Sequence, residues 1–434
     1  MNLTESEPIK QIVQFAAGVA QSNIAVPPPV AELCREMMLN AAGAALAGAG
    51  HPDGIALARV VREMGGNGRS TIIGMGMRTS PVYASLVNAA LVRLLDYDDN
   101  TVNTGAHCTA AVFPPVMALG EMHGYAGQAV LSAFAVGCEV TARLSAAGST
   151  NGSAGAVGAA VASSMLLGLD AESLASAIGL AVDSASGDAG YGSAGAAALA
   201  EGRAAMQGMI AALSAEAGID GAISGATIGT ADFADLGVHW RLEDPGVTIR
   251  LYPCHSASHS VIDAILGLAQ LHRFEPSDVS SMHVGVTAAT TEQLPNVLPA
   301  DGWQARRSIG FIAAATLCHG APLINFFSDP AVHDEGVRAM MGRTSVEATL
   351  PASPLALNPA EVAITLTDGR TLRHRIDHPR GSPAMRLDVE ELDAKFLYCT
   401  RYILPADHID EAVSSFRGIA EIENVTGMAS VLGG

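Results

Sequence analysis

The chain has 434 residues, more than one ordinary hydrophobic core accommodates, so two domains are expected. Its net charge of −19 at pH 7 argues against a nucleic acid or an anionic membrane surface as partner. Hydrophobic residues make up 49% of the chain, aromatic residues only 4%, and 46 residues are glycine. This composition is typical of closely packed helices with small residues at their crossings.

Helical periodicity dominates the first 270 residues. Three prolines at 27–29 precede a long amphipathic run over 30–46, which is a proline-led helix start. The β-branched segment 70–74 is predicted as a short strand. Further helices are predicted over 53–63, 80–95, 109–123, 126–145, 155–167, 171–185, 195–217 and 257–272.

The composition changes near Pro276. Residues 279–287 alternate like a strand, and 361–374 have the pattern of a hairpin around Asp368-Gly369. Helices are expected between them at 306–318 and 330–342, and helical patterning returns from about Val389. We therefore predict a mainly α protein with two domains. Residues 1–272 and 389–434 form a large all-helical domain, and residues 273–388 form a smaller, inserted α/β domain.

Several features favour a soluble, cytoplasmic protein. The N-terminal segment begins acidic and lacks the basic region of a signal peptide. The most apolar stretch, 309–327, carries His319 and Asn325 and is interpreted as a buried helix and a turn. The cysteines have no CxxC spacing, which indicates reduced and mostly buried thiols. They are Cys34, Cys108, Cys138, Cys254, Cys318 and Cys399.

Three carboxylates, Asp96, Asp98 and Asp99, fall where the predicted helix 80–95 stops. Negative charge at a helix C-terminus meets the negative end of the helix dipole, which is unfavourable. A catalytic or ligand-orienting role would account for such a run. A turn in which Arg93 pairs with one of the carboxylates would account for it equally well.

Several segments, in order along nearly the whole chain, together resemble one protein family. They are Leu95–Asn100, Leu166–Asp170, Ala177–Ala181, Leu251–His259 with Asp263-Ala264, Arg307-Ser308 through Gly320, Asp377–Gly381 and Ala394–Phe396. In these segments the chain resembles the MmgE/PrpD family, which includes 2-methylcitrate dehydratases, cis-aconitate decarboxylases and iminodisuccinate epimerases.

The resemblance implies that the smaller domain is a lid, that the active site lies in the cleft between domains, and that the protein is a homodimer. It also implies a lyase or isomerase that uses no cofactor and no metal. Such an enzyme removes a proton α to a carboxylate of a small di- or tricarboxylate, as in 2-methylcitrate dehydration. An epimerase or double-bond isomerase of a dicarboxylate is the first alternative. A catalytically inactive, ligand-binding paralogue is the second.

The resemblance also exposes departures at positions where many family members carry polar residues. Histidines correspond to Val102, Ser149 and Ala200, lysines to Ala197 and Arg250, and a tyrosine to Phe311. Arginine cannot replace a lysine base, because its pKa lies above about 12. Arg250 can still bind a carboxylate bidentately. Only Lys10 and Lys395 are lysines, which limits any lysine-base mechanism.

The remaining candidates for acid–base catalysis are His107, His255 and His259, because histidine has an ordinary pKa of about 6.5. Asp96 or Asp99 is expected to orient His107. On a helix, His255 and His259 would share a face with Asp263, a spacing that could also bind a metal. The alternative is that one of the two is a core histidine.

Further candidates concern substrate binding. The helix starts after the glycine-rich runs 148–155 and 186–195 could bind carboxylates through backbone amides, or the glycines could serve close helix packing. Neither run is a nucleotide-binding fingerprint, because no strand leads into it. Cys254 is either a thiol acid or base or a buried packing residue. The substrate-binding candidates are Arg250, Ser149, Asn151, Tyr191, Asp98 and Cys254.

Overall fold

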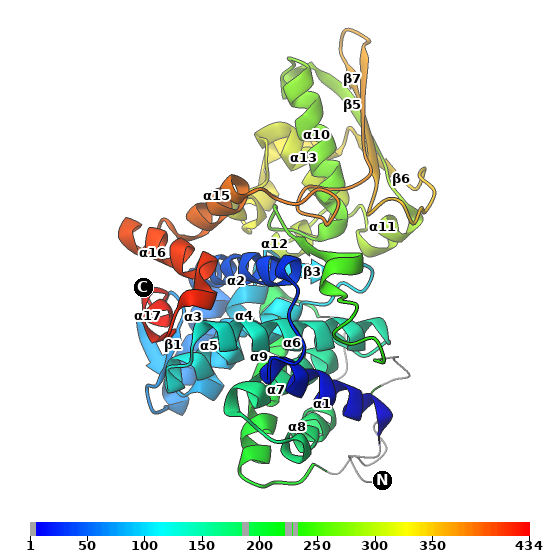
Figure 1. Ribbon diagram of the computed structural model, residues 1–434. Helices are drawn as coiled ribbons and strands as arrows, with labels where there is room; N and C mark the ends of the chain where they lie inside the picture. Colours follow the sequence, from blue (N-terminus) through cyan, green and yellow to red (C-terminus); the bar gives the residue numbers. More distant parts are fainter. Residues whose placement is uncertain (1–5, 185–190, 222–227, 229–232) are drawn as a thin grey trace. The chain divides into compact units, whose positions relative to one another are not determined.

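The computed structural model describes residues 6–184, 191–221, 228 and 233–434 (Figure 1). The chain forms two compact units. Unit 1 comprises Met1–Ile249 and Asp388–Gly434, and unit 2 comprises Arg250–Leu387. The fold is mainly α, as predicted. The described strands of unit 1 have three residues each, and the longer strands lie in unit 2.

Unit 1 is a stack of helices to which both ends of the chain contribute. Its N-terminal helices are α1 (Glu7–Ala20), α2 (Pro28–Ala49), α3 (Pro52–Met64), α4 (Pro81–Arg93), α5 (Cys108–His123), α6 (Gly127–Ala146), α7 (Asn151–Leu167), α8 (Ala171–Ser184) and α9 (Ala194–Glu216). Its C-terminal helices are α15 (Val389–Thr400), α16 (Ala406–Arg417) and α17 (Thr426–Val431). Two antiparallel pairs join β1 (Ser70–Ile72) to β2 (Met77–Thr79) and β3 (Asp99–Thr101) to β4 (Val247–Ile249).

Small residues let the helices of unit 1 approach closely. A Cβ atom added at Gly158 in α7 would lie 1.9 Å from Thr141 Oγ1 in α6. At Gly202 in α9 it would lie 2.3 Å from the Leu86 carbonyl oxygen in α4. The glycine-rich helices therefore serve close packing, which the composition predicts.

Helix α6 is also the one helix of the described residues that is long and apolar enough to cross a membrane. Of its apolar window, 78% is buried, as in the core helix of a soluble protein.

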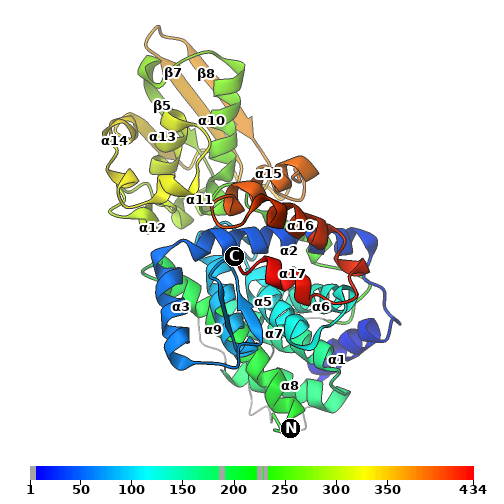
Figure 2. The same ribbon diagram turned by 90° about the vertical axis from the view of Figure 1, so that its left-hand side faces the viewer.

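Unit 2 has a four-stranded sheet covered by helices (Figure 2). The strand order is β6 (Thr344–Glu347), β5 (Val279–Gly285), β7 (Ala360–Leu366), β8 (Thr371–Ile376), with β6 parallel to β5 and the other pairs antiparallel. The predicted hairpin is β7–β8, and Gly369 in its turn has φ +90°. The helices are α10 (His259–Leu271), α11 (Ala288–Gln293), α12 (Gly302–Ala305), α13 (Ile309–His319) and α14 (Glu335–Met341).

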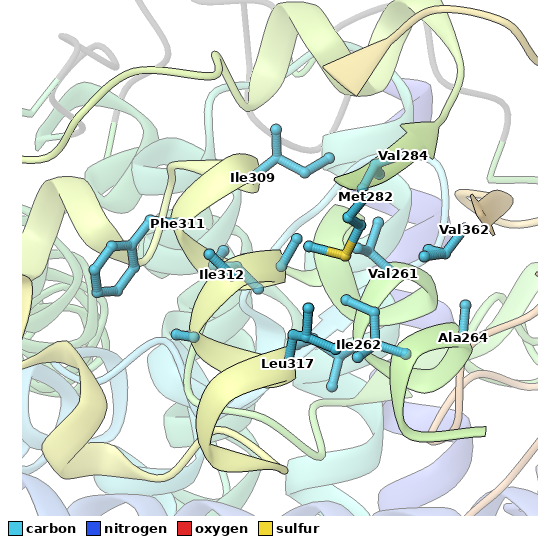
Figure 3. Close-up of a cluster of buried hydrophobic side chains, with 14 of the residues drawn as sticks. Val261, Ile262, Ala264, Met282, Val284, Ile309, Phe311, Ile312, Leu317 and Val362 are labelled. Carbon is cyan, nitrogen blue, oxygen red and sulfur yellow. The ribbon is translucent and has the colours of Figure 1, made fainter. Parts of the chain in front are cut away.

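The core of unit 2 lies between the sheet and α10 and α13. Val261 and Ile262 from α10 meet Met282 from β5 and Ile312 from α13 (Figure 3). Helix α10 packs against β7 and β8, so it belongs to unit 2. The predicted domain boundary at residue 272 is therefore too late, and the compact unit begins at Arg250. Helical periodicity showed that α10 exists but not which sheet it covers.

Candidate functional site

The acidic run lies just beyond the end of α4 and is buried. The chain turns at Asp96, whose φ is +51°, and enters β3 at Asp99. Strand β3 pairs with β4 in the register Asp99↔Ile249. Asp96, Asp98 and Asp99 each expose at most 1% of their surface. Burial of three carboxylates within four residues requires partners for each of them.

Each carboxylate has a different partner. Arg93, at the end of α4, forms an ion pair with Asp96, as the structural interpretation of the run anticipated. The Thr109 hydroxyl, in α5, donates to Asp99 Oδ2 at 2.8 Å. Asp98 Oδ2 lies 2.6 Å from Nδ1 of His107, the residue before α5. The carboxylate in contact with His107 Nδ1 is thus Asp98, whereas the sequence analysis had expected Asp96 or Asp99 in this role.

The Asp98–His107 pair is suited to acid–base chemistry. Asp98 is fully buried and His107 exposes 8%. A carboxylate that accepts from Nδ1–H fixes the imidazole ring and its tautomer, and it stabilises the imidazolium that forms when Nε2 takes up a proton. Asp98, which was predicted to bind substrate, contacts His107 Nδ1 through Oδ2.

Lys395 is a residue of this region that the sequence analysis did not select. It comes from α15, near the other end of the chain, and exposes 5%. Its Nζ donates to the Tyr97 carbonyl oxygen at 2.8 Å and to Asn40 Oδ1 at 2.5 Å. Two signals pointed to it in the sequence: the scarcity of lysine in the chain and the place of Lys395 in the family segment Ala394–Phe396.

In unit 2, the tyrosine of the segment 251–259 contacts an acid of α10. The Tyr252 hydroxyl donates to Asp263 Oδ1 at 2.7 Å, and the Arg380 backbone N–H donates to Oδ2 at 2.8 Å. Burial raises the pKa of Asp263, while these two hydrogen bonds oppose the rise. Burial and the Asp263 carboxylate raise the pKa of the Tyr252 phenol, so this hydroxyl stays protonated.

The two histidines of this segment occupy different environments. His259, the first residue of α10, is fully buried, with Nε2 3.4 Å from the Cys254 carbonyl oxygen and its ring edge-on to Tyr252. His255 precedes the 3₁₀ turn Ser256–Ser258, and its Nδ1 accepts from the Ala257 backbone N–H. The two histidines therefore do not share a helix face, which corrects the prediction. Among the described residues, no group of three or more His, Cys, Asp or Glu could hold a metal ion.

The other candidates in unit 2 are also buried. Cys254 is fully buried, with Sγ 3.4 Å from Ser258 Oγ, as in the packing interpretation. Arg250 exposes 4% and Arg306 3%. Phe311, which replaces a tyrosine of the family pattern, exposes 1% and lies in the hydrophobic core (Figure 3).

The structure gives little support to the prediction that the glycine-rich helix starts bind carboxylates. Helix α7 begins at Asn151, whose side chain lies outside the described residues, and Ser149 is half-buried in the turn before it. The second run, 186–195, falls partly outside the described residues as well. Tyr191 exposes 38% of its surface. The structure thus brings together Asp96, Asp98, Asp99 and His107 in unit 1, and Arg250, Cys254, His255 and His259 in unit 2.

Comparison with known proteins shows two family domains, the second of which covers unit 2 and continues into the C-terminal helices of unit 1. The model of the MmgE/PrpD N-terminal domain matches residues 10–240, and that of the MmgE/PrpD C-terminal domain matches residues 252–417. The chain belongs to the MmgE/PrpD family. The two family domains meet between residues 240 and 252, where unit 1 passes into unit 2.

Among curated proteins, the chain is similar to cis-aconitate decarboxylases. It is 26% identical to that of Mus musculus, over 92% of this chain and 88% of the relative. It is 25% identical to that of Homo sapiens, over 84% and 82%, and 26% identical to that of Aspergillus terreus, over 86% and 85%. These MmgE/PrpD relatives support a lyase of this family's type, without specifying the reaction.

Proposed function

We propose that this MmgE/PrpD protein is a cofactor-independent lyase acting on a small di- or tricarboxylate. The observation that carries the proposal is the buried Asp98–His107 pair, with 2.6 Å between Oδ2 and Nδ1. A carboxylate that accepts from Nδ1–H of a buried imidazole suits Nε2 to exchange protons or to bind a ligand. The similarity to cis-aconitate decarboxylases supports a carboxylate substrate.

In the proposed reaction, His107 Nε2 exchanges a proton with the carbon α to a substrate carboxylate. When the C–H bond breaks, the proton goes to Nε2 and the electron pair passes into an enolate-like carboxylate. For water loss, this pair then forms the double bond as the bond from the neighbouring carbon to its hydroxyl breaks, and the leaving hydroxide takes a proton from the imidazolium, which returns His107 to its neutral form. For loss of CO₂, the C–C bond to the leaving carboxylate breaks, and its electron pair passes to a carbon α to a remaining carboxylate. That carbon then takes a proton from the imidazolium of His107. Asp98 stabilises the imidazolium in either direction.

We propose that Arg250 binds a substrate carboxylate. The chain carries 43 acidic and 24 basic residues, so anion binding depends on local positive charge. Arg250 is buried, and a guanidinium binds a carboxylate through two parallel hydrogen bonds, which a lysine cannot do. In the variant R250K, KM for the substrate should rise more than kcat falls.

Epimerisation or double-bond isomerisation of a dicarboxylate is the second candidate function. It requires a second base, and the fully buried His259 is the candidate for it among the predicted acid–base residues. A substrate that returns its proton to the opposite face, without loss of water or CO₂, would favour this alternative.

The test is incubation of the purified protein with a panel of carboxylic acids, followed by proton NMR of the products. The panel contains citrate, 2-methylcitrate, cis-aconitate, trans-aconitate, iminodisuccinate and malate. Water loss, CO₂ loss and isomerisation give different product spectra, so the reaction class is read directly. The matched variants are H107N and H123N, because His107 precedes α5 and His123 ends it, on the surface. The proposal predicts activity that H107N abolishes and H123N retains.

A further inference from the structure

Lys395 is buried in unit 1 although nothing in its local sequence requires a lysine there. It is one of two lysines in the chain and exposes 5% of its surface, whereas Lys10 is exposed on α1. An ammonium is strongly hydrated, so its burial is costly unless hydrogen bonds and negative charge replace the water. The contacts of Lys395 therefore indicate what its burial achieves.

The contacts of Nζ join two distant parts of the chain to the acidic run. It donates to Asn40 Oδ1 of α2 at 2.5 Å and to the Tyr97 carbonyl oxygen at 2.8 Å. It also lies 4.0 Å from the centre of the Tyr97 ring, a cation–π contact. Tyr97 is 298 residues away in sequence and stands between Asp96 and Asp98.

The packing of α15 fixes the position of this ammonium. Phe396, the next residue, lies against Gly43 of α2, where an added Cβ atom would be 3.0 Å from the Phe396 ring. The close approach of α15 to α2 depends on this glycine. Helix α2 thus carries both the contact that seats α15 and the amide oxygen of Asn40 that orients Nζ.

The backbone that Lys395 holds is a sharp turn. Asp96 has φ +51°, a left-handed conformation that costs an L-residue about 1 kcal/mol or more. Two residues later, Asp98 reaches His107 at 2.6 Å. A bond to the intervening carbonyl of Tyr97 restrains the peptide that joins the turn to Asp98.

We propose that Lys395 is a positioning residue, whose ammonium holds the Tyr97 carbonyl and thereby fixes Asp98 against His107. Its positive charge also stands beside a segment with three buried carboxylates, which reduces their mutual repulsion. The claim that Lys395 positions Asp98 depends only on contacts within unit 1. The expected effect on kcat rests on the proposed function.

The experiment uses the full-length variants K395M and K395R with K10M as the matched control. Methionine keeps the length and apolar stem of the side chain but removes the charge and the donors. The proton in the His107–Asp98 hydrogen bond is expected to give a downfield proton NMR signal, which is assigned by its loss in H107N and by its upfield shift in D98N, where the acceptor is no longer charged. Circular dichroism and thermal unfolding establish that each variant is folded, and kcat and KM are measured on the substrate found with the carboxylate panel.

In K395M the downfield signal should shift or disappear, and kcat should fall about tenfold or more while KM changes less than about threefold. K395R should recover part of both, and K10M should match the unsubstituted protein. A role in stability alone would lower the unfolding temperature without moving the signal or kcat.

An unmoved downfield signal in folded K395M would overturn the inference, whatever the activity. If K395M does not fold, K395R serves as the test, because arginine keeps the positive charge but moves the N–H donors away from the Tyr97 carbonyl. A downfield signal at the same position in K395R as in the unsubstituted protein would then overturn the inference. If the signal is lost in K395M while the unsubstituted protein acts on no carboxylate, the positioning role stands and the proposed function fails.

Discussion

Replacing Asp98 by asparagine tests the chemical role of the buried pair. The substitution keeps the shape of the side chain but removes the charge that faces His107 Nδ1 at 2.6 Å. A hydrogen bond to a charged group contributes about 1.5–3 kcal/mol. If this energy stabilises the imidazolium-like transition state, and each 1.36 kcal/mol is a factor of ten, kcat/KM should fall about 10- to 150-fold in D98N.

The assay is steady-state turnover of the substrate identified with the carboxylate panel, with D410N as a control on the exposed side of α16. D98N should unfold at nearly the same temperature as the unsubstituted protein, because asparagine can still accept from Nδ1–H. A kcat/KM within about twofold of the unsubstituted value, in folded D98N, would refute the reasoning. The same result would assign Asp98 a role in packing alone.

Two further predictions concern stability. Burial raises the pKa of the Asp263 carboxyl, so the folded state binds the carboxyl proton more tightly than the unfolded state does. The resulting stabilisation of the fold is fully present below pH 3.8, the ordinary pKa, and is lost as the pH rises through the raised pKa. Urea unfolding at pH 4–7 should therefore show unfolding free energy falling with pH relative to D263N; a pH-independent difference would contradict this. In α7, G158A should lose about 1–3 kcal/mol, because its Cβ would overlap Thr141 Oγ1. G427A, with nothing within 4 Å, should gain up to about 1 kcal/mol, and equal effects of the two would contradict the packing account.

Patterns that repeat within one element were predicted well. The amphipathic run 30–46 lies within α2, and the turn at Asp368-Gly369 gives the β7–β8 hairpin. These features depend on local spacing and turn chemistry, which a sequence displays directly.

Contacts between distant residues could not be predicted. Which carboxylate faces His107 depends on the left-handed turn at Asp96 and on the pairing of β3 with β4, about 150 residues later. Lys395 reaches Tyr97 only because α15 returns to α2. The His255–His259 pair failed for a local reason, since α10 starts at His259 and leaves His255 in the preceding turn.

The most direct measurement of the central claim is proton NMR of the reaction in D₂O, comparing the unsubstituted protein with H107N. If His107 exchanges a proton with the carbon α to a carboxylate, decarboxylation or isomerisation in D₂O places deuterium at that carbon, and so does hydration of the unsaturated product if the reaction is water loss; H107N shows no incorporation. A product of decarboxylation, isomerisation or hydration without deuterium at the α carbon, or equal incorporation by H107N, would contradict the account.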